Sequence, residues 1–382
     1  MYDVIIIGAG PAGSTLARLI GKDRSVLLVE SRRMGFPGRQ SPSHEKCCGG
    51  LLAPDARKWL LSHGLEIPET VLDSTQPLSV RAIDASSGLI RDYPRTYVNL
   101  CRSSFEQWLL SLLPPTVSRL DGHRCVAVKR KVDGRWEVRL RGPNGTVCHS
   151  ARCLVGADGA NSIVRHTGDQ RIPADTVYVA VQDTFPRLSS ATEIPYAAFF
   201  HPAMTDFYGW LIPKRDRILC GLALPYRVCS VSERMEMLHQ IATRSGYQLE
   251  GEYRRQGCLL LRPRPGDICY GADGSFCIGE AAGWISPSSA EGFSYAFASA
   301  EALASALNRH ETPQAILRAY RNGTASLRLN LAWKRLKMKV MFTPSLRRAV
   351  MKSGLASVYR RDMPSAERLA LDGSNTVMQE RR

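Results

Sequence analysis

The sequence predicts an α/β protein with a Rossmann-type nucleotide-binding domain, a second domain built on an antiparallel sheet, and helices toward its C-terminal end. The first observation is the continuous apolar run Val4–Ile7, typical of a strand buried on both faces, which leads straight into a glycine-rich loop. The second is the segment 176–265, which is rich in aromatic and β-branched residues and lacks a loop of this kind. The third is an alanine-rich helical stretch from Gly292 to about Leu307, followed by helical segments from Pro313 to Met351.

The glycine-rich loop has the spacing Gly8-x-Gly10-x-x-Gly13, and an apolar helix is expected over Ala12–Ile20. In such a loop the first glycine allows a sharp turn, the second lets a pyrophosphate approach the backbone, and the third lets helix and strand pack closely. The helix N-terminus offers N–H groups and a partial positive charge to the phosphates. The residues expected to contact the ligand here are Gly8, Gly10, Pro11, Ala12 and Gly13.

A second apolar run, Ser25–Val29, ends in Glu30, about twenty residues beyond the loop. A carboxylate in this place accepts hydrogen bonds from a ribose hydroxyl, and it disfavours a 2′-phosphate because two anions repel. Ser31 and Arg32 come next and are expected at the same ligand. This segment therefore combines a strand, a glycine loop, a helix, a second strand and a terminal acid, and the combination predicts a dinucleotide site. The segment alone leaves open whether the ligand is NAD or FAD.

Short elements are expected to follow a polar loop that covers residues 31–46. Pro54 is typical of the first turn of a helix. Ser103 or Ser104 is expected to cap a further helix, with Arg102 just before it, where its side chain would reach the ligand or remain solvated. The elements predicted here are a helix at 54–62, strands near 78–84, 89–93 and 97–102, and a helix at 105–113.

Residues 117–154 are predicted to form a β-meander, with turns at Asp133-Gly134 and Asn144-Gly145. A short apolar strand from Cys153 is then expected to deliver Asp158-Gly159 into a loop that becomes a helix. Arg165 would lie in the first turns of this helix, as a candidate structural partner of Asp158.

The segment 275–294 again has the character of a nucleotide site. A strand is expected to end at Gly279-Glu280, a loop to hold Pro287, and Glu291-Gly292 to open the alanine-rich helix. The N–H groups of that helix would stabilise an anionic ligand ring, whereas Glu291 would also fit as an ordinary N-terminal helix acid.

We expect two interleaved domains followed by helices. One helix near 232–245 is predicted within the second domain, and the tail after Pro364 is expected to be poorly ordered. The predicted boundaries are 1–75, 96–175 and 266–310 for the nucleotide-binding domain, 76–95 and 176–265 for the sheet domain, and 311–382 for the C-terminal helices and tail.

Bulk properties narrow the class of protein. The net charge of +16 fits nucleic acid, an anionic membrane surface or acidic ligands, but no nucleic-acid-binding motif accompanies it, so we expect no nucleic acid partner. The 11 cysteines include no CxxC pair, which predicts neither a metal site nor a disulfide framework. No secretory signal or membrane-spanning run is apparent, so a cytoplasmic protein, peripheral to the membrane at most, is expected.

Three segments together resemble the flavoprotein superfamily of p-hydroxybenzoate hydroxylase. The glycine loop with Glu30 matches its ADP-binding fingerprint, Ala157-Asp158-Gly159 with Ser162 and Arg165 its second motif, and Gly279-Glu280 its third, which usually ends in aspartate. The resemblance implies the fold of that superfamily, and FAD as the cofactor, with the third acid on the ribityl chain. The further cofactor contacts it implies are Arg102, Asp158, Gly159, Gly279, Glu280, Pro287, Glu291, Gly292 and Phe293.

Two more segments are similar to geranylgeranyl reductases. Cys48-Gly49-Gly50 looks like a segment whose cysteine lies near the flavin, and Tyr208-x-Trp210 begins a stretch similar to their Tyr-x-Trp-x-Phe-Pro motif. The resemblance implies that Cys48 donates a proton or shapes the pocket; packing under a glycine turn is the alternative. Tyr208 and Trp210 lie two apart, so a strand would place them on one side, as a wall of a substrate channel or as ordinary core.

The resemblance implies an FAD-dependent oxidoreductase that reduces carbon–carbon double bonds of a small apolar substrate, an isoprenoid or another lipid, by hydride transfer from reduced flavin. The alternatives are a monooxygenase that hydroxylates a small aromatic, a halogenase, whose Ile-Pro motif ending matches Ile212-Pro213, and an electron carrier or sensor. The chain shows no second dinucleotide fingerprint. NAD(P)H is therefore expected as a transient electron donor, unless a carrier protein supplies the electrons.

The segment Leu327–Lys352 is rich in lysine and arginine, with Trp333 and several leucines at helical spacing. A basic helix with an apolar side suits an anionic membrane surface. A helix packed on the nucleotide-binding domain, with a solvated basic face, is the alternative.

Overall fold

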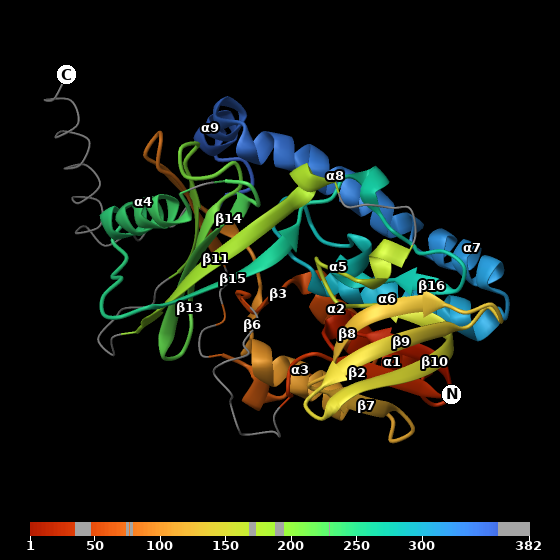
Figure 1. The fold of residues 1–382 in the computed structure, drawn as a ribbon. Helices are drawn as coiled ribbons and strands as arrows, with labels where there is room; N and C mark the ends of the chain where they lie inside the picture. Colours follow the sequence, from red (N-terminus) through yellow and green to blue (C-terminus); the bar gives the residue numbers. More distant parts are fainter. Residues whose placement is uncertain are drawn as a thin grey trace, which may run out of the picture. The chain divides into compact units, whose positions relative to one another are not determined.

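A computed structural model of the chain describes residues 1–34, 47–73, 76, 79–167, 173–187, 195–228 and 230–357 (Figure 1). Most of the loop expected over 31–46, and the tail after Pro364, lie outside these residues. The chain divides into two compact units. The first comprises Met1–Asp73, Val98–Val179 and Cys258–Lys339, and the second comprises Ser74–Tyr97, Ala180–Gly257 and Val340–Arg382.

The first unit is built on a parallel sheet in the strand order β7-β2-β1-β10-β16. Its central strand β1 is buried on both faces, as predicted. Val4 and Ile6 pack with α1 and α6, whereas Ile5 and Ile7 pack into a cluster on the other face that includes Trp284. The strands are β1 (Tyr2–Ile7), β2 (Val26–Glu30), β7 (Ser118–Asp121), β10 (Gly145–Gly156) and β16 (Ser275–Cys277).

Strand β10 changes partners along its length. Its first half pairs antiparallel with β9 (Trp136–Gly142), which continues to β8 (Arg124–Arg130). From Ala151 it also pairs with β1, and from Leu154 it lies between β1 and β16. The meander prediction is therefore right for β8–β10 and wrong in two details. β7 pairs with β2 at the far edge of the sheet, and the short strand expected from Cys153 is the end of β10.

The helices of the first unit follow the predicted pattern, with one early start. Helix α3 begins at Arg102 with Cys101 as its N-cap, so neither serine caps it, and the strand expected at 97–102 shrinks to Val98–Asn99. The N–H of Phe105 already bonds to the Cys101 carbonyl at 2.9 Å. The helices are α1 (Pro11–Ile20), α2 (Pro54–Ser62), α3 (Arg102–Ser111), α5 (Gly279–Ala282), α6 (Phe293–Arg309) and α7 (Pro313–Gly323).

Several short elements complete the first unit. β3 (Leu51–Leu52) pairs with β6 (Val98–Asn99). The strand expected to reach Gly279-Glu280 ends at Cys277, and these two residues open α5 instead. The helix expected after Asp158 is a single 3₁₀ turn. The 3₁₀ turns are Glu69–Val71, Val164–Thr167, Ala174–Thr176 and Pro265–Asp267.

The second unit is organised around a sheet in the order β15-β11-β14-β13-β12-β4-β5. Most of its pairs are antiparallel, as expected, but β12 and β4 run parallel. The elements are β4 (Ser79–Asp84), β5 (Leu89–Pro94), β11 (Val177–Pro186), β12 (Tyr196–Phe200), β13 (Gly209–Pro213), β14 (Arg217–Pro225), α4 (Val231–Arg244) and β15 (Arg254–Leu261).

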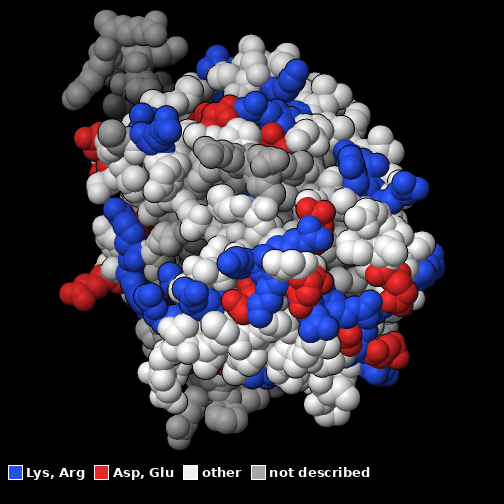
Figure 2. Space-filling view, turned by 45° about the vertical axis from the view of Figure 1, so that its right-hand side comes forward, with Lys and Arg blue, Asp and Glu red and all other residues white. Residues whose placement is uncertain are grey.

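Two further helices end the described chain, α8 (Ala325–Phe342) and α9 (Pro344–Ser353). They separate where Pro344 begins the second helix, since proline fits the first turn and not a helix interior. Within the described residues, every helix is too short or too polar to span a lipid bilayer. Figure 2 shows lysine and arginine side chains spread over one face, with acidic side chains beside many of them.

Candidate functional site

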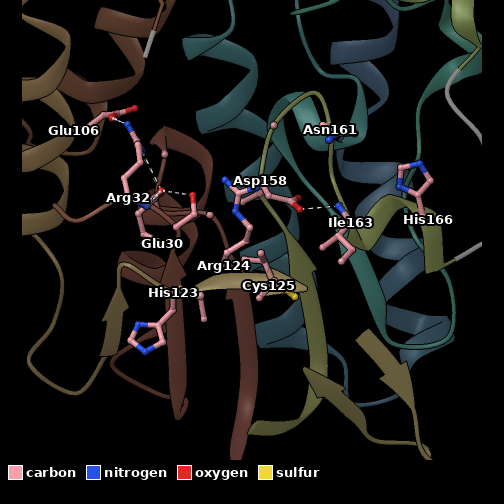
Figure 3. A pocket seen from close by; sticks show the side chains of 17 residues that line it. Glu30, Arg32, Glu106, His123, Arg124, Cys125, Asp158, Asn161, Ile163 and His166 are labelled. Carbon is pink, nitrogen blue, oxygen red and sulfur yellow. Dashed lines mark hydrogen bonds and ion pairs between the residues drawn. The ribbon is translucent and has the colours of Figure 1, made fainter. Parts of the chain in front are cut away.

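A cavity of about 640 Å³ opens in the first unit where β1, β2 and β10 end (Figure 3). Parallel strands of an open sheet bind ligands at their carboxyl ends, so this is the expected place for a dinucleotide. Of the predicted cofactor residues, the cavity wall includes Gly8, Gly10, Glu30, Ser31, Arg32, Asp158 and Gly159.

The glycine loop is shaped as its spacing predicts. Gly8 has φ +104°, a conformation that favours glycine, and a side chain there would meet the carbonyl of Ala157. A side chain at Gly13 would meet the carbonyl of Gly8. A Cβ on Gly10, by contrast, would have no protein atom within 4 Å, so this position opens into the space where a ligand would lie.

The N-terminus of α1 is open to an anion. Gly10 is its N-cap and supplies no side-chain hydrogen bond, and the first turn carries no acidic residue. The first N–H groups of a helix lack backbone partners, and a phosphate satisfies them while it meets the positive end of the helix dipole. The loop therefore fits a pyrophosphate.

Glu30 is buried and held by donors of the protein. Its Oε2 accepts a hydrogen bond from the Ala9 N–H at 3.0 Å, and its Oε1 accepts from the Nε of Arg32 at 3.0 Å. Burial alone would raise the pKa of Glu30, but the bonds and charge of Arg32 bring it below its ordinary value. The carboxylate thus stays charged at the cavity edge and ties β2 to the glycine loop.

Arg32 connects this carboxylate to a second one, Glu106 on α3. Its Nη1 lies 2.8 Å from Oε2 of Glu106, and Figure 3 shows Arg32 between the two acids. The other oxygen of Glu106 accepts two bonds from Arg102, at 2.6 and 3.0 Å. Burial opposes the charge on Glu106, but the two guanidinium groups lower its pKa to about 2. Two partly buried arginines and two buried acids therefore form one charge-balanced network.

Cys48 lies at the far end of this network. The Nη1 of Arg102 is 3.5 Å from its Sγ, and the N–H of Gly50 lies at the same distance. The guanidinium of Arg102 also stacks over the ring of Phe293, 4.7 Å from its centroid. The structure thus gathers three predicted residues, Cys48, Arg102 and Phe293, and joins them through Glu106 to the dinucleotide cavity.

Asp158 has one bound and one unused oxygen. Its Oδ2 accepts a hydrogen bond from the Ile163 N–H at 2.8 Å, whereas its buried Oδ1 has no hydrogen-bond partner among the described residues. Burial raises the pKa of this carboxyl group. A buried acceptor without a partner is costly, so the cavity is complementary to a ligand that donates a hydrogen bond here.

The expectation that Arg165 pairs with Asp158 is wrong. The guanidinium of Arg165 instead donates to the carbonyl oxygens of Ala281 at 3.3 Å and Asp267 at 2.6 Å. Asp158 accepts its hydrogen bond from the backbone N–H of Ile163 in its own loop. The Ser162 hydroxyl oxygen accepts a hydrogen bond from the backbone N–H of Arg165 at 3.2 Å. These local bonds replace the expected helix, because side-chain acceptors compete with helical backbone bonds.

The third motif lies beside this loop. Glu280 accepts a hydrogen bond from the Leu261 N–H at 3.0 Å through Oε1. Gly292 is the N-cap of α6, as predicted, and Phe293 begins that helix. Glu291 lies 3.4 Å from Lys334, so its carboxylate holds α8, and Pro287 accepts a bond from Arg262 through its carbonyl oxygen at 3.3 Å.

Several residues of the cavity wall were not predicted from the sequence. Glu106 carried one usable signal, since Arg102 and Glu106 have the i, i+4 spacing of a helical ion pair. The others gave none, because only the folded sheet brings them to the ligand loop. They are His123, Arg124 and Cys125 at the start of β8, and Asn161, Ile163 and His166 after Asp158. Burial raises the pKa of Cys125 to about 12, so that this thiol stays neutral.

Tyr208 and Trp210 belong to the second unit, where Tyr208 directly precedes β13 and Trp210 is its second residue. Their ring centroids are 6.1 Å apart, so the two side chains do lie on one side. Tyr208 is buried and stacks near Phe207, whereas Trp210 is half-buried and donates from Nε1 to Gln182 at 3.3 Å. In the described ranges no group of three His, Cys, Asp or Glu side chains could hold a metal ion.

Comparison of the sequence with curated proteins finds relatives that align over nearly the whole chain. It is 38% identical over 370 residues to Protein CbrA from Escherichia coli O6:H1, an alignment that covers 95% of this chain and 97% of the relative. Protein CbrA from Escherichia coli O157:H7 is also 38% identical, over 94% of this chain and 98% of the relative. A scan against protein-family models found no match.

Solved structures share the fold at low identity. A geranylgeranyl bacteriochlorophyll reductase-like protein from Thermoplasma acidophilum has a TM-score of 0.77 at 16% identity, covering 97% of this chain and 95% of that one. PqsL, a probable FAD-dependent monooxygenase from Pseudomonas aeruginosa, has a TM-score of 0.66 at 20% identity, covering 92% and 99%. The flavin-dependent brominase Bmp2 has a TM-score of 0.65 at 19% identity and full coverage of both chains. The predicted fold class is confirmed.

Proposed function

We propose that this chain, which belongs to the CbrA family, is an FAD-dependent oxidoreductase that reduces carbon–carbon double bonds in an apolar substrate, an isoprenoid or another lipid. The observation that carries this proposal is the buried network from Glu30 to Cys48. It joins a dinucleotide cavity to a thiol through Arg32, Glu106 and Arg102.

The cavity fits the ADP half of FAD. The glycine loop and the N-terminus of α1 would hold the pyrophosphate, with Gly10 leaving room for it. Glu30 already accepts hydrogen bonds from Ala9, Ser31 and Arg32, and an ionised carboxylate has about four acceptor sites. A ribose hydroxyl would therefore take the place of a longer bond, such as that from the Ser31 hydroxyl at 3.2 Å. The orphaned Oδ1 of Asp158 would accept from a further ligand donor. The names of the relatives in the same fold support FAD over NAD.

Reduced FAD, when bound, supplies a hydride. The chain would then have to deliver a proton to the other carbon of the double bond, and Cys48 is the group we assign to that step. Arg102 holds the sulfur from 3.5 Å, and its charge would stabilise the thiolate left behind. Glu106 fixes Arg102 through two hydrogen bonds, so the position of the thiol depends on a residue that does not touch it.

The aromatic pair supports an apolar substrate. Tyr208 and Trp210 present two neighbouring rings on one side of β13, and aromatic side chains with a few polar groups are the usual lining of small-molecule pockets. We assign them to the wall of the substrate channel. The electron donor in this proposal is NAD(P)H bound transiently, with a carrier protein as the alternative.

A monooxygenase is the second candidate. It is favoured by the likeness to PqsL, and halogenation is favoured more weakly by the likeness to Bmp2 and by Ile212-Pro213. In these reactions the flavin meets oxygen, so they consume oxygen in step with the electron donor, whereas a reductase does not.

The test begins with protein reconstituted with FAD, reduced by dithionite under anaerobic conditions and mixed with polyisoprenoid alcohols and their phosphates. We expect mass spectrometry to show substrate that has gained one H₂ for each bond reduced. Aerobic assays with NADPH and NADH, followed with an oxygen electrode, form the second arm. Oxygen uptake that matches donor oxidation and yields a hydroxylated or halogenated product would overturn the reductase in favour of the second candidate.

A further inference from the structure

We propose that the outward face of α8 docks on the surface of an anionic lipid bilayer. This inference does not rest on the proposed reduction, since it concerns where the chain is held and not what it converts. The face concerned lies on α8 up to Lys339, the part of the helix that belongs to the first unit.

The inner face of α8 is explained by packing. Leu331 is fully buried, and Leu327 packs against the same core cluster. Asn330 accepts a hydrogen bond from the Tyr295 hydroxyl at 2.6 Å. Two basic residues also anchor the helix, Arg328 on the Tyr270 hydroxyl at 2.9 Å and Arg335 on the Pro263 carbonyl at 2.8 Å. These contacts fix which side of α8 faces the solvent.

The outer face is apolar, and packing does not explain it. Leu329, Trp333 and Leu336 are 74%, 67% and 55% exposed. Spacings of four and three residues place them on one side of a helix, where they form a single stripe. Scattered exposed apolar residues are normal on a protein surface, whereas an aligned stripe that includes tryptophan marks a contact surface.

The charge beside the stripe selects an anionic partner. At about 3.6 residues per turn, Lys337 falls on one flank of the stripe and Lys339 on the other, and both are exposed. The sequence contains no Asp or Glu between Glu311 and Asp362, so this segment is strongly basic. A helix with this arrangement lies in the membrane interface, its apolar side in the acyl boundary and its lysines at anionic headgroups.

Two other occupants fit the stripe less well. A second copy of the chain would bring the same lysines face to face, and like charges repel. A nucleic acid would place its phosphates against the outermost residues, which here are leucine and tryptophan and not lysine or arginine. A lipid surface satisfies both the apolar stripe and its basic flanks.

The experiment is flotation of the full-length chain with vesicles of pure phosphatidylcholine and of phosphatidylcholine mixed with phosphatidylglycerol. We expect the chain to float with the mixed vesicles at low salt, and to be released as salt rises, because the headgroup attraction is screened. Trp333→Ser combined with Leu336→Ser should lower the partition coefficient at least about ten-fold. Lys337→Ala combined with Lys339→Ala should lower it roughly thirty-fold on mixed vesicles, at about five-fold per lysine.

Matched controls lie on α2, which carries an exposed leucine and lysine of its own. Leu61→Ser, at a side chain that is 51% exposed, and Lys58→Ala should leave flotation unchanged. The melting temperature of each variant should match that of the unsubstituted chain, because all these side chains are exposed. The readout needs no substrate turnover, so its failure would leave the proposed reductase standing.

Three results would overturn the proposal. The unsubstituted chain could remain at the bottom of the gradient with mixed vesicles. It could float while the α8 variants float equally well. Alternatively, the Trp333/Leu336 variant could convert a dimer to a monomer in gel filtration without a change in flotation, which would assign the stripe to a second copy of the chain.

Discussion

Each unit of the molecule contains a buried carboxylate paired with arginine. In the first unit Glu106 receives hydrogen bonds from Arg32 and Arg102, and its side chain is 2% exposed. In the second unit Asp84 is fully buried and accepts from Arg347 on α9 at 2.9 Å and from the Ser86 hydroxyl at 2.6 Å. Both acids have a pKa below the ordinary value, because guanidinium and hydrogen-bond partners outweigh the effect of burial.

The two pairs differ in what lies beyond them. Arg347 continues to the Met341 carbonyl at 2.9 Å and stacks over Phe200, so the pair ends inside the joint between α9 and the sheet. The Glu106 network instead ends at a cavity on one side and at Cys48 on the other. A buried ion pair is therefore no sign of a functional site by itself. The open cavity, the orphaned Asp158 oxygen and the thiol at its ends are what distinguish the first.

Glu106→Gln should have the largest effect. It leaves the partly buried guanidinium groups of Arg32 and Arg102 without their shared counter-charge, and breaking a buried ion pair costs about 3–5 kcal/mol. We expect urea unfolding to show a loss of this order. We also expect fluorescence titration to show weaker FAD binding, because Arg32 no longer holds Glu30 in place. Unchanged FAD affinity in this variant would disconnect the network from the cavity.

Asp84→Asn is the counterpart in the second unit. The amide keeps the shape and one hydrogen-bond acceptor but loses the charge opposite Arg347, so we expect a stability loss of about 3 kcal/mol, at the lower end for a broken buried pair. FAD affinity should remain within about two-fold of the unsubstituted value, well under 1 kcal/mol. A marked loss of FAD affinity here would remove the distinction between the two pairs.

Acid should weaken the first unit through Glu106. Its pKa lies near 4.5 in the unfolded chain and at about 2 in the folded one, so the stabilisation is complete above pH 4.5 and is lost as pH falls toward 2. The loss is on the order of 3 kcal/mol by linkage. Urea unfolding between pH 4.5 and pH 2 should show this loss of stability. In Glu106→Gln the free energy of unfolding should depend less steeply on pH. If the free energy of unfolding of Glu106→Gln fell with pH as steeply as that of the unsubstituted chain, other carboxylates would be responsible for the acid sensitivity.

Cys48→Ser should leave both stability and FAD binding intact and act on the reaction alone. Loss of a positioned proton donor reduces a rate by about 100-fold or more. Single-turnover reduction of substrate under anaerobic conditions measures this directly. Cys47→Ser is the matched control, because Cys47 is adjacent in sequence and buried, and its backbone carbonyl, which the substitution keeps, accepts the bond from the Cys258 thiol. Equal rates in Cys48→Ser and the unsubstituted chain would contradict the assignment of the Cys48 thiol as the proton donor.

Short sequence patterns predicted most of the fold. The apolar run before Gly8, the glycine spacing and the two hairpin turns each specify backbone geometry over a few residues, and the structure follows them. The start of α3 was missed because serine is the better cap in isolation, whereas Arg102 gains two bonds to Glu106 by joining the helix one turn early.

The site was predictable only in part, for a related reason. The glycine loop and Glu30 can be recognised by their spacing. Arg32 and Glu106, by contrast, are 74 positions apart, and only the folded chain brings the Arg32 side chain, just after β2, to Glu106 on α3. Arg165 shows the converse error. A charged residue close in sequence to Asp158 looked like its partner, yet the folded loop directs it to the carbonyl groups of Ala281 and Asp267.

FAD binding by Gly10→Ala tests most directly whether the glycine-loop cavity holds the cofactor. A Cβ at Gly10 would touch no protein atom within 4 Å, and its φ of −69° suits alanine, so the fold should not change. We expect this variant to keep the melting temperature of the unsubstituted chain and to bind FAD at least about ten-fold more weakly, since the new methyl group occupies ligand space. Full FAD affinity in this variant, or no FAD binding by the unsubstituted chain, would contradict the claim that this cavity holds the cofactor.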